Sequence, residues 1–162
     1  MYPDEPQLAI SRVLDAPRTL AFRAFTDPDH VAKWWGPIDS TLLRDEMEFD
    51  VRPGGFQRWT VVAASQPDVR VRIRIDLTDV ADGDLLEGVM HVTGRLPGDI
   101  EPFQTRFRVE FYDEPGGRTR LEIRQWVPAH LTGPSTQGWL EALDQLDATL
   151  LDVQAGATDA EV

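Results

Sequence analysis

The feature that most constrains the fold of this chain is a long amphipathic stretch near its C-terminal end. From Ser135 to Val153, polar residues surround large apolar residues at steps of four, three and four, namely Trp139, Leu143, Leu146 and Leu150. This spacing predicts an α-helix with one broad buried face. At about 1.5 Å per residue the helix extends for roughly 28 Å, which is enough to cross a small domain. We expect it to cover the segment that precedes it.

That preceding segment, from Thr41 to Pro128, has the two-residue period of β-strands. The alternation is clearest between Val69 and Leu77, where Val, Ile and Leu alternate with Arg and Asp. Such a strand has one apolar and one polar side, which is typical of an antiparallel sheet with one solvated face. Turns rich in Gly, Pro, Asp and Ser separate the strands. We predict strands at about residues 41–49, 56–63, 69–77, 85–95, 103–111 and 120–127.

Three shorter elements are expected before this sheet. A short strand covers residues 8–13, and a helix begins at Asp15-Ala16-Pro17, with a capping oxygen and a Pro in its first turn. A second short helix covers residues 29–34. The order predicts an α+β domain, in which about six to seven strands curl around the C-terminal helix and leave a hollow. We expect this domain at 8–153, between a flexible N-terminal tail (1–7) and a flexible acidic tail (154–162).

Composition limits the classes of partner. The 162 residues carry a formal net charge of −12, so nucleic acid and anionic membrane surfaces are repelled. The chain has no cysteine, which excludes disulfides, thiolate chemistry and Cys-based zinc sites. The sequence has no apolar run long enough to span a membrane and no visible signal peptide. We therefore expect a cytoplasmic protein with a single domain.

Six short motifs follow one another along the chain: Ala16-Pro17, Thr26-Asp27-Pro28, Trp34-Trp35-Gly36-Pro37, Asp50-Val51-Arg52-Pro53-Gly54-Gly55, Gly117-Arg118-Thr119-Arg120-Leu121 and Gly138-Trp139. Together, and in this order, they resemble the activator of Hsp90 ATPase homologue 1-like (AHSA1-like) family of the START/Bet v 1-like (SRPBCC) superfamily. The resemblance covers about residues 8–151. Each motif is common by itself, and their order is what makes the resemblance specific.

The resemblance implies a helix-grip fold, in which a curved antiparallel sheet wraps around the long C-terminal helix and encloses a hydrophobic cavity. Members of the family include chaperone activators, polyketide-binding resistance proteins and cyclases, so the resemblance does not assign a function. The N-terminal domain of eukaryotic Hsp90 activators is not in this sequence. A chaperone role is therefore the least favoured expectation.

The titratable residues form no motif for catalysis or metal binding. No pair among the three histidines has the spacing of metal ligands, these being His30, His91 and His130. We expect no metal and no cofactor. Four carboxylates lie in strands of mixed polarity. One of them could face the cavity and act as a general base, but ion pairs with the arginines of the outer face are the favoured role. The four are Asp45, Glu46, Glu48 and Glu87.

Aromatic and polar residues at expected inner positions are the candidates for lining a cavity. Core packing is the alternative explanation for the aromatic ones. A buried amide such as that of Gln125 needs a hydrogen-bond partner, which a ligand can supply. The candidate ligand-binding residues are Trp34, Trp35, Gln57, Trp59, Met90, His91, Phe107, Gln125 and Trp139.

These observations predict a non-enzymatic protein that binds a small hydrophobic or aromatic molecule between the sheet and the C-terminal helix; a homodimer is left open. The first alternative is a cyclase- or hydratase-like enzyme, which requires a cavity carboxylate or His91 without a structural partner. The second is a chaperone cofactor or other protein-interaction module. That alternative requires an exposed apolar patch on the outer sheet face, where arginine rows are expected instead.

Overall fold

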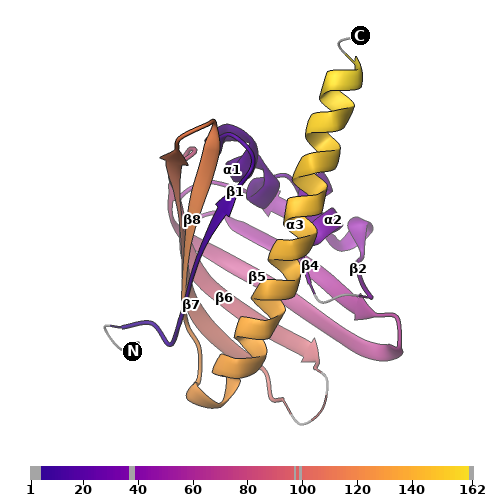
Figure 1. Cartoon of the computed structure of the whole chain (residues 1–162). Coiled ribbons are helices and arrows are strands. Elements are labelled where there is room, and N and C mark those ends of the chain that lie inside the picture. The colour runs from indigo at the N-terminus through magenta and orange to yellow at the C-terminus, as the bar shows by residue number, and fades with distance from the viewer. Residues whose placement is uncertain (1–4, 37–38, 97, 99, 161–162) are drawn as a thin grey trace.

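The computed structural model describes residues 5–36, 39–96, 98 and 100–160, without side chains at 67 and 155–160. Its helices and strands follow one another as in Figure 1. Their bounds are β1 (Leu8–Leu14), α1 (Arg18–Thr26), α2 (Pro28–Trp34), β2 (Ser40–Leu42), the 3₁₀ helix η1 (Arg44–Glu46), β3 (Glu48–Asp50), β4 (Phe56–Ala63), β5 (Gln66–Ala81), β6 (Leu85–Arg95), β7 (Phe103–Glu114), β8 (Arg118–Trp126), the 3₁₀ helix η2 (Ala129–Leu131) and α3 (Thr132–Ala160).

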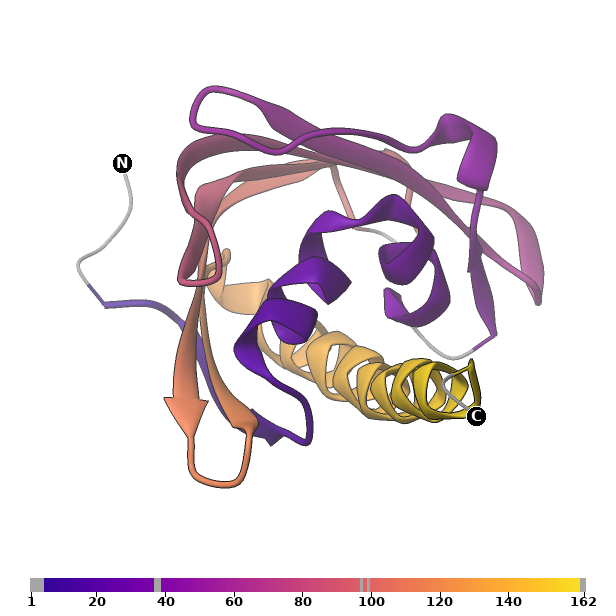
Figure 2. The same ribbon diagram turned by 90° about the horizontal axis from the view of Figure 1, so that it is seen from above.

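All strands pair antiparallel in one sheet, in the order β1-β8-β7-β6-β5-β4-β2, with β3 also paired to β4. The sheet curls around α3, while α1 and α2 lie between the sheet and α3 at one end (Figures 1 and 2). We call the face toward α3 concave and the opposite face convex. The predicted helix-grip fold, with a long C-terminal helix and two short helices after the first strand, is confirmed.

The apolar stripe of α3 and the concave face of the sheet together form the core. Leu143 and Leu146 of α3 have no exposed surface, and neither do Val109, Leu121 and Ile123 of the facing strands β7 and β8. Burial of apolar surface contributes about 25 cal/mol per Å², so this contact is a major source of stability. The predicted stripe of α3 is the face that the structure buries.

Polar contacts also fix α3 to the edge of the sheet. The guanidinium of Arg12 in β1 donates a hydrogen bond of 2.7 Å to Asp144 of α3 and pairs with Asp147 on the next turn. β1 is an edge strand, because only β8 lies beside it in the sheet order. The two ion pairs therefore connect the end of the sheet to the helix that it encloses.

The segment predicted as one strand over residues 41–49 is instead two short strands, β2 and β3, separated by η1. Both strands pair with β4. Arg44, Asp45 and Glu46 are three consecutive charged residues, which cannot alternate between a buried and a solvated face. The Glu46 N–H donates to the Leu43 carbonyl at 2.9 Å and closes the 3₁₀ turn there. The sheet consequently has eight strands.

Several element boundaries also differ from the predictions. Pro17, and not Asp15, is the N-cap of α1, and no side chain caps that helix. The strand predicted from residue 69 begins earlier, at Gln66, so the turn after β4 is shorter than expected. Helix α3 runs from Thr132 to Ala160, beyond the predicted end at Val153.

The tails were predicted at 1–7 and 154–162. Their residues 1–4 and 161–162 lie outside the described residues, and the flexibility of both tails stays a prediction. None of the helices described is long and apolar enough to cross a membrane.

The convex face carries cross-strand ion pairs, as the arginine rows predicted. Arg106 and Arg108 of β7 both pair with Glu87 of the neighbouring strand β6. Arg108 and Arg124 pair with Glu110 at 3.2 and 3.0 Å. Other carboxylates on this face have partners too: Glu48 accepts from Arg58, and Glu46 accepts from Thr60. Within the described residues, Arg70 and Arg72 have no ion pair.

The packing of α3 can be tested with two equal truncations on the same helix. We expect Leu146→Ala to lower the free energy of unfolding by about 2–5 kcal/mol, because Leu146 is fully buried. Leu151, which is 57% exposed, is the matched control, and Leu151→Ala is expected to cost less than about 0.5 kcal/mol. Urea unfolding measures both. Equal effects would contradict the observed orientation of the helix.

The ion pairs of Glu110 predict an acid-sensitive contribution to stability. Burial raises the pKa of Glu110, but hydrogen bonds from Tyr112 and Arg108 and the charges of Arg108 and Arg124 outweigh it, so the pKa is lowered overall. A lowered pKa stabilises the fold above the unfolded-state pKa of about 4.3, and that contribution disappears as the pH falls through the folded-state pKa.

We therefore expect Glu110→Gln to lower the free energy of unfolding by roughly 1 kcal/mol at neutral pH. The difference from the wild type should shrink as the pH falls below about 4. Urea unfolding across this pH range measures it. Asp152→Asn, at an exposed carboxyl with no ion pair in the described residues, is the control and should show little difference at any pH. A difference for Glu110→Gln that grows in acid would overturn this expectation.

Candidate functional site

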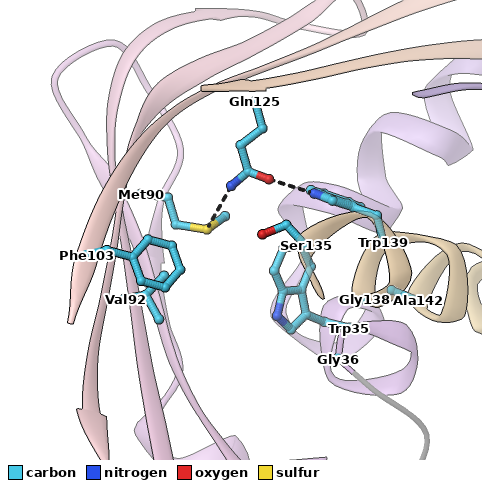
Figure 3. Close-up of a pocket in the computed structure, with 10 residues that line it drawn as sticks. All are labelled: Trp35, Gly36, Met90, Val92, Phe103, Gln125, Ser135, Gly138, Trp139 and Ala142. Carbon is cyan, nitrogen blue, oxygen red and sulfur yellow. Dashed lines mark hydrogen bonds between the residues drawn. The ribbon is translucent and has the colours of Figure 1, made fainter. Parts of the chain in front are cut away.

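A cavity of about 160 Å³ lies between the concave face of the sheet and the N-terminal half of α3 (Figure 3). It occupies one end of the space beneath the helix, while the core fills the rest. The sheet, the segment after α2 and the helix all contribute side chains. The lining residues are Trp35, Gly36, Met90, Val92, Phe103, Gln125, Ser135, Gly138, Trp139 and Ala142.

The cavity is left open on the helix side by a stripe of small residues. Ser135, Gly138 and Ala142 follow at steps of three and four, so they share one face of α3. A Cβ atom added at Gly138 would have no other atom within 4 Å. From Leu143 onward the large buried side chains of α3 are leucines, namely Leu143, Leu146 and Leu150. The change from small to large residues along the helix therefore sets where the cavity ends.

The sheet side of the cavity is built by alternate residues of the strands. Met90 and Val92 are two residues apart in β6 and so point to the same face. Phe103 begins β7, and its ring lies beside Val92 in Figure 3. These three side chains face the stripe of small residues on α3. The sheet wall of the cavity is thus apolar except where β8 contributes an amide.

The third wall is formed by Trp35 and Gly36, which follow α2. Gly36 has a φ of 98°, a conformation that glycine adopts readily. The side-chain amide of Gln145 on α3 donates a hydrogen bond of 2.7 Å to the Gly36 carbonyl. The Trp35 ring stands edge-on to Trp139 and Trp59, with centroids 5.1 and 5.0 Å apart. These contacts fix Trp35 as a rigid aromatic wall.

Gln125 of β8 is the polar centre of the site. Its Oε1 accepts a hydrogen bond of 2.9 Å from the Trp139 indole N–H. Its Nε2 donates to Thr105 Oγ1 at 2.8 Å and lies 3.7 Å from Met90 Sδ. The amide is buried, so these partners satisfy a group that would be costly to bury alone. The hydrogen bond to Trp139 also ties the sheet to α3 at the edge of the cavity.

The electrostatics of the cavity favour an uncharged occupant. None of the described residues that line it is titratable. Within the part of the chain that the structure describes, no group of three or more His, Asp or Glu side chains is placed to hold a metal. Transfer of an ion into such an apolar site is expensive. The arrangement can enclose a small neutral molecule and offer it two polar side chains, Gln125 and Ser135.

Four of the nine predicted site residues line this cavity: Trp35, Met90, Gln125 and Trp139. The structure places the other five elsewhere. His91 lies on the convex face, with its Nε2 3.0 Å from Asp76 Oδ2. Adjacent residues of a strand point to opposite faces, so Met90 and His91 cannot both line the cavity. The role expected for His91 as a cavity group is therefore corrected.

The remaining predicted residues belong to the core beside the cavity. Trp34 donates its indole N–H to the Ala24 carbonyl, and Gln57 donates to the Phe25 carbonyl, both at 2.8 Å. Gln57 of β4 thus holds the end of α1 against the sheet, and Trp34 holds it against α2. Two more aromatic side chains are buried in the same core, namely Trp59 and Phe107.

Six lining residues were not among the predicted ones: Gly36, Val92, Phe103, Ser135, Gly138 and Ala142. One signal for three of them was present in the sequence. Ser135, Gly138 and Ala142 form a stripe of small residues on the predicted helix, where large apolar residues would fill the space. Val92 follows from Met90 by the period of the strand. Nothing in the local pattern distinguishes Phe103 from the other phenylalanines of β7.

Comparison with known proteins relates this arrangement to solved structures. A family model described as activator of Hsp90 ATPase homolog 1-like protein matches residues 15–151. No curated protein matches the sequence significantly. A protein from Chromobacterium violaceum is similar in structure, with a TM-score of 0.73 and 23% identity, over 87% of this chain and 94% of that one.

Two further solved structures are similar at comparable identity. A protein from Mycobacterium smegmatis has a TM-score of 0.73 at 20% identity, over 90% of this chain and 91% of that one. The AHSA1 protein from Silicibacter pomeroyi has a TM-score of 0.71 at 20% identity, over 89% and 96% of the two chains. At such identities the likeness establishes the fold, while function must be argued from the site.

The link between Gln125 and Trp139 can be tested by a double-mutant cycle. We expect Gln125→Leu to lower the free energy of unfolding by about 1–3 kcal/mol, because it leaves the buried Trp139 N–H without an acceptor. Trp139→Phe removes the same hydrogen bond from the other side. Combined, the two changes should cost less than the sum of the single effects, by about 0.5–3 kcal/mol. Strict additivity in urea unfolding would show that the hydrogen bond contributes nothing.

Proposed function

This chain belongs to the activator of Hsp90 ATPase homologue 1-like family, and we propose that it binds a small, uncharged hydrophobic or aromatic molecule in the cavity beneath α3. The observation that carries the proposal is the cavity itself: an apolar space walled by Trp35 and Trp139 that the core does not fill. An apolar pocket between the sheet and α3, which the small residues of α3 leave open instead of core side chains filling it, is typical of a small-molecule site.

The dimensions of the cavity indicate the size of that occupant. Dry apolar cavities of about 150 Å³ hold molecules such as benzene, and this cavity has a volume of about 160 Å³. Its walls are aromatic and aliphatic, with few polar groups to orient a ligand, as is usual for small-molecule sites. A molecule built around one aromatic ring fits this volume, whereas a multi-ring molecule would extend beyond it.

No observation favours the two alternative functions. A cyclase or hydratase would need an acid or base at the cavity, but the lining that the structure describes contains none, and His91 is paired with Asp76 on the convex face. A protein-interaction module would need an apolar patch on that face, which instead carries the ion pairs of Glu87 and Glu110. The cytoplasmic location and the oligomeric state stay predictions.

Filling the cavity tests the proposal. We expect toluene to quench or shift the tryptophan fluorescence of the wild-type protein in a saturable manner, because Trp35 and Trp139 line the cavity. Gly138→Leu places a side chain in the open space beside Gly138 and should weaken toluene binding at least about tenfold, which corresponds to about 1.4 kcal/mol. It should not lower the melting temperature, since leucine favours helix over glycine.

Gly133→Leu is the matched control, because Gly133 is exposed on the same helix and does not line the cavity. This variant should bind toluene as the wild type does. Absence of saturable binding to the wild type, or equal binding to both leucine variants, would contradict the proposed site.

A further inference from the structure

We propose that the cavity selects a single-ring phenol over hydrocarbons and acids of the same size, because Gln125 and Ser135 together recognise one hydroxyl group. The ligand hydroxyl would donate its proton to Gln125 Oε1 and accept a hydrogen bond from Ser135 Oγ. This inference rests on the proposed function and gives its ligand a chemical class. It depends on which hydrogen-bonding positions the protein itself leaves unused.

The orientation of the Gln125 amide is fixed by Trp139. An indole N–H can donate a hydrogen bond but cannot accept one, so the amide atom 2.9 Å from Trp139 Nε1 must be the oxygen. The nitrogen then faces Thr105 Oγ1. The Thr105 hydroxyl donates to the Arg106 carbonyl at 3.2 Å, which leaves its oxygen free to accept from Gln125. Only one orientation of the Gln125 amide and the Thr105 hydroxyl therefore satisfies all of these hydrogen bonds.

This arrangement leaves an acceptor position at the cavity wall. An amide oxygen has two acceptor positions, and the described protein uses one of those of Gln125, for Trp139. On the nitrogen, one hydrogen is used by Thr105 and the other is directed to Met90 Sδ. Sulfur is a weak acceptor, but the second Nε2 hydrogen of Gln125 nevertheless has a partner in Met90 Sδ. Gln125 therefore offers a ligand an acceptor rather than a donor.

Ser135 supplies the complementary group from the opposite wall. Its hydroxyl points from α3 into the space bounded by Met90 and Phe103 (Figure 3). The Ser135 hydroxyl has no hydrogen bond within the described part of the chain, whereas the hydroxyl of its neighbour Thr136 donates to the Thr132 carbonyl at 2.8 Å. A serine hydroxyl can donate as well as accept. It is therefore available to donate to an oxygen in the cavity.

An acceptor on one wall and a hydroxyl on the other complement a ligand hydroxyl, which both donates and accepts. A ketone or ether oxygen accepts only, so it would leave the Gln125 acceptor unpaired and close to another partial negative charge. A carboxylate would meet the same oxygen without a cation among the lining residues, and desolvation of its charge would oppose binding. A hydrocarbon would leave both polar groups unpaired. The cavity volume restricts the aromatic part to about one ring.

The experiment compares phenol, toluene, anisole and benzoate by titration against the wild-type protein, followed by the indole N–H signals in NMR spectra. We expect phenol to bind at least about tenfold more tightly than toluene or anisole, and benzoate to show no saturable binding. Water solvates phenol better than it solvates toluene, so burial of the ring alone would give the opposite order. A preference for phenol therefore reports on hydrogen bonds.

Two variants of α3 locate the recognition. Ser135→Ala should weaken phenol binding about tenfold and change toluene binding by less than about twofold. Thr136→Ala removes the neighbouring hydroxyl, which is engaged with the helix backbone, and should change neither affinity by more than about twofold. Measurement of the melting temperature without ligand confirms that each variant folds.

The possible outcomes separate this inference from the proposed function. Saturable binding of toluene with equal or weaker binding of phenol would overturn the phenol inference and leave the proposed function standing. A preference for phenol that is undiminished in Ser135→Ala would overturn the role of Ser135 and with it the inference. Failure of both ligands to bind would overturn the proposed function as well.

Discussion

Burial of one face of α3 against the curled sheet is the interaction on which the rest of the structure depends. Neither partner is stable by itself: an isolated helix is marginal in water, and the sheet would expose the apolar residues of its concave face. Leu143 and Leu146 join the two partners at the centre of the core. The ion pairs of Arg12 with Asp144 and Asp147 also fix the orientation of α3 at the edge of the sheet.

The packing of α3 on the sheet also creates the candidate site, because the residues that α3 turns toward the sheet are small near its N-terminus and large further along. Where it carries leucines, helix and sheet are in contact. Where it carries Ser135, Gly138 and Ala142, a space of about 160 Å³ remains. The hydrogen bond from Trp139 to Gln125 spans the boundary between these two regions. This hydrogen bond joins α3 to the sheet where apolar contact ends, and it fixes the orientation of the Gln125 amide at the cavity.

Charge is divided between the two faces of the sheet. The convex face carries cross-strand ion pairs, in which Glu87 and Glu110 each serve two arginines. Solvent at this face reduces the cost of desolvating these groups. Among the described residues, those that line the cavity on the concave face carry no charge, since an ion buried there without a partner would destabilise the fold. Because alternate residues of a strand point to opposite faces, the charged side chains lie on the convex face and the cavity lies on the concave face.

The sequence by itself determined most of the elements and the alternation of side chains along the strands, but not which set of side chains faces the cavity, as Met90 and His91 show. β4 and β6 have the predicted bounds, because alternation and turn residues act over a few positions. Only the tertiary structure decided which part of the concave face stays uncovered. Gln57 and Trp59 face it as predicted but are covered by α1 and Trp35, while Gln125 borders an open space. That difference arises from contacts between residues far apart in the chain, which no local pattern encodes.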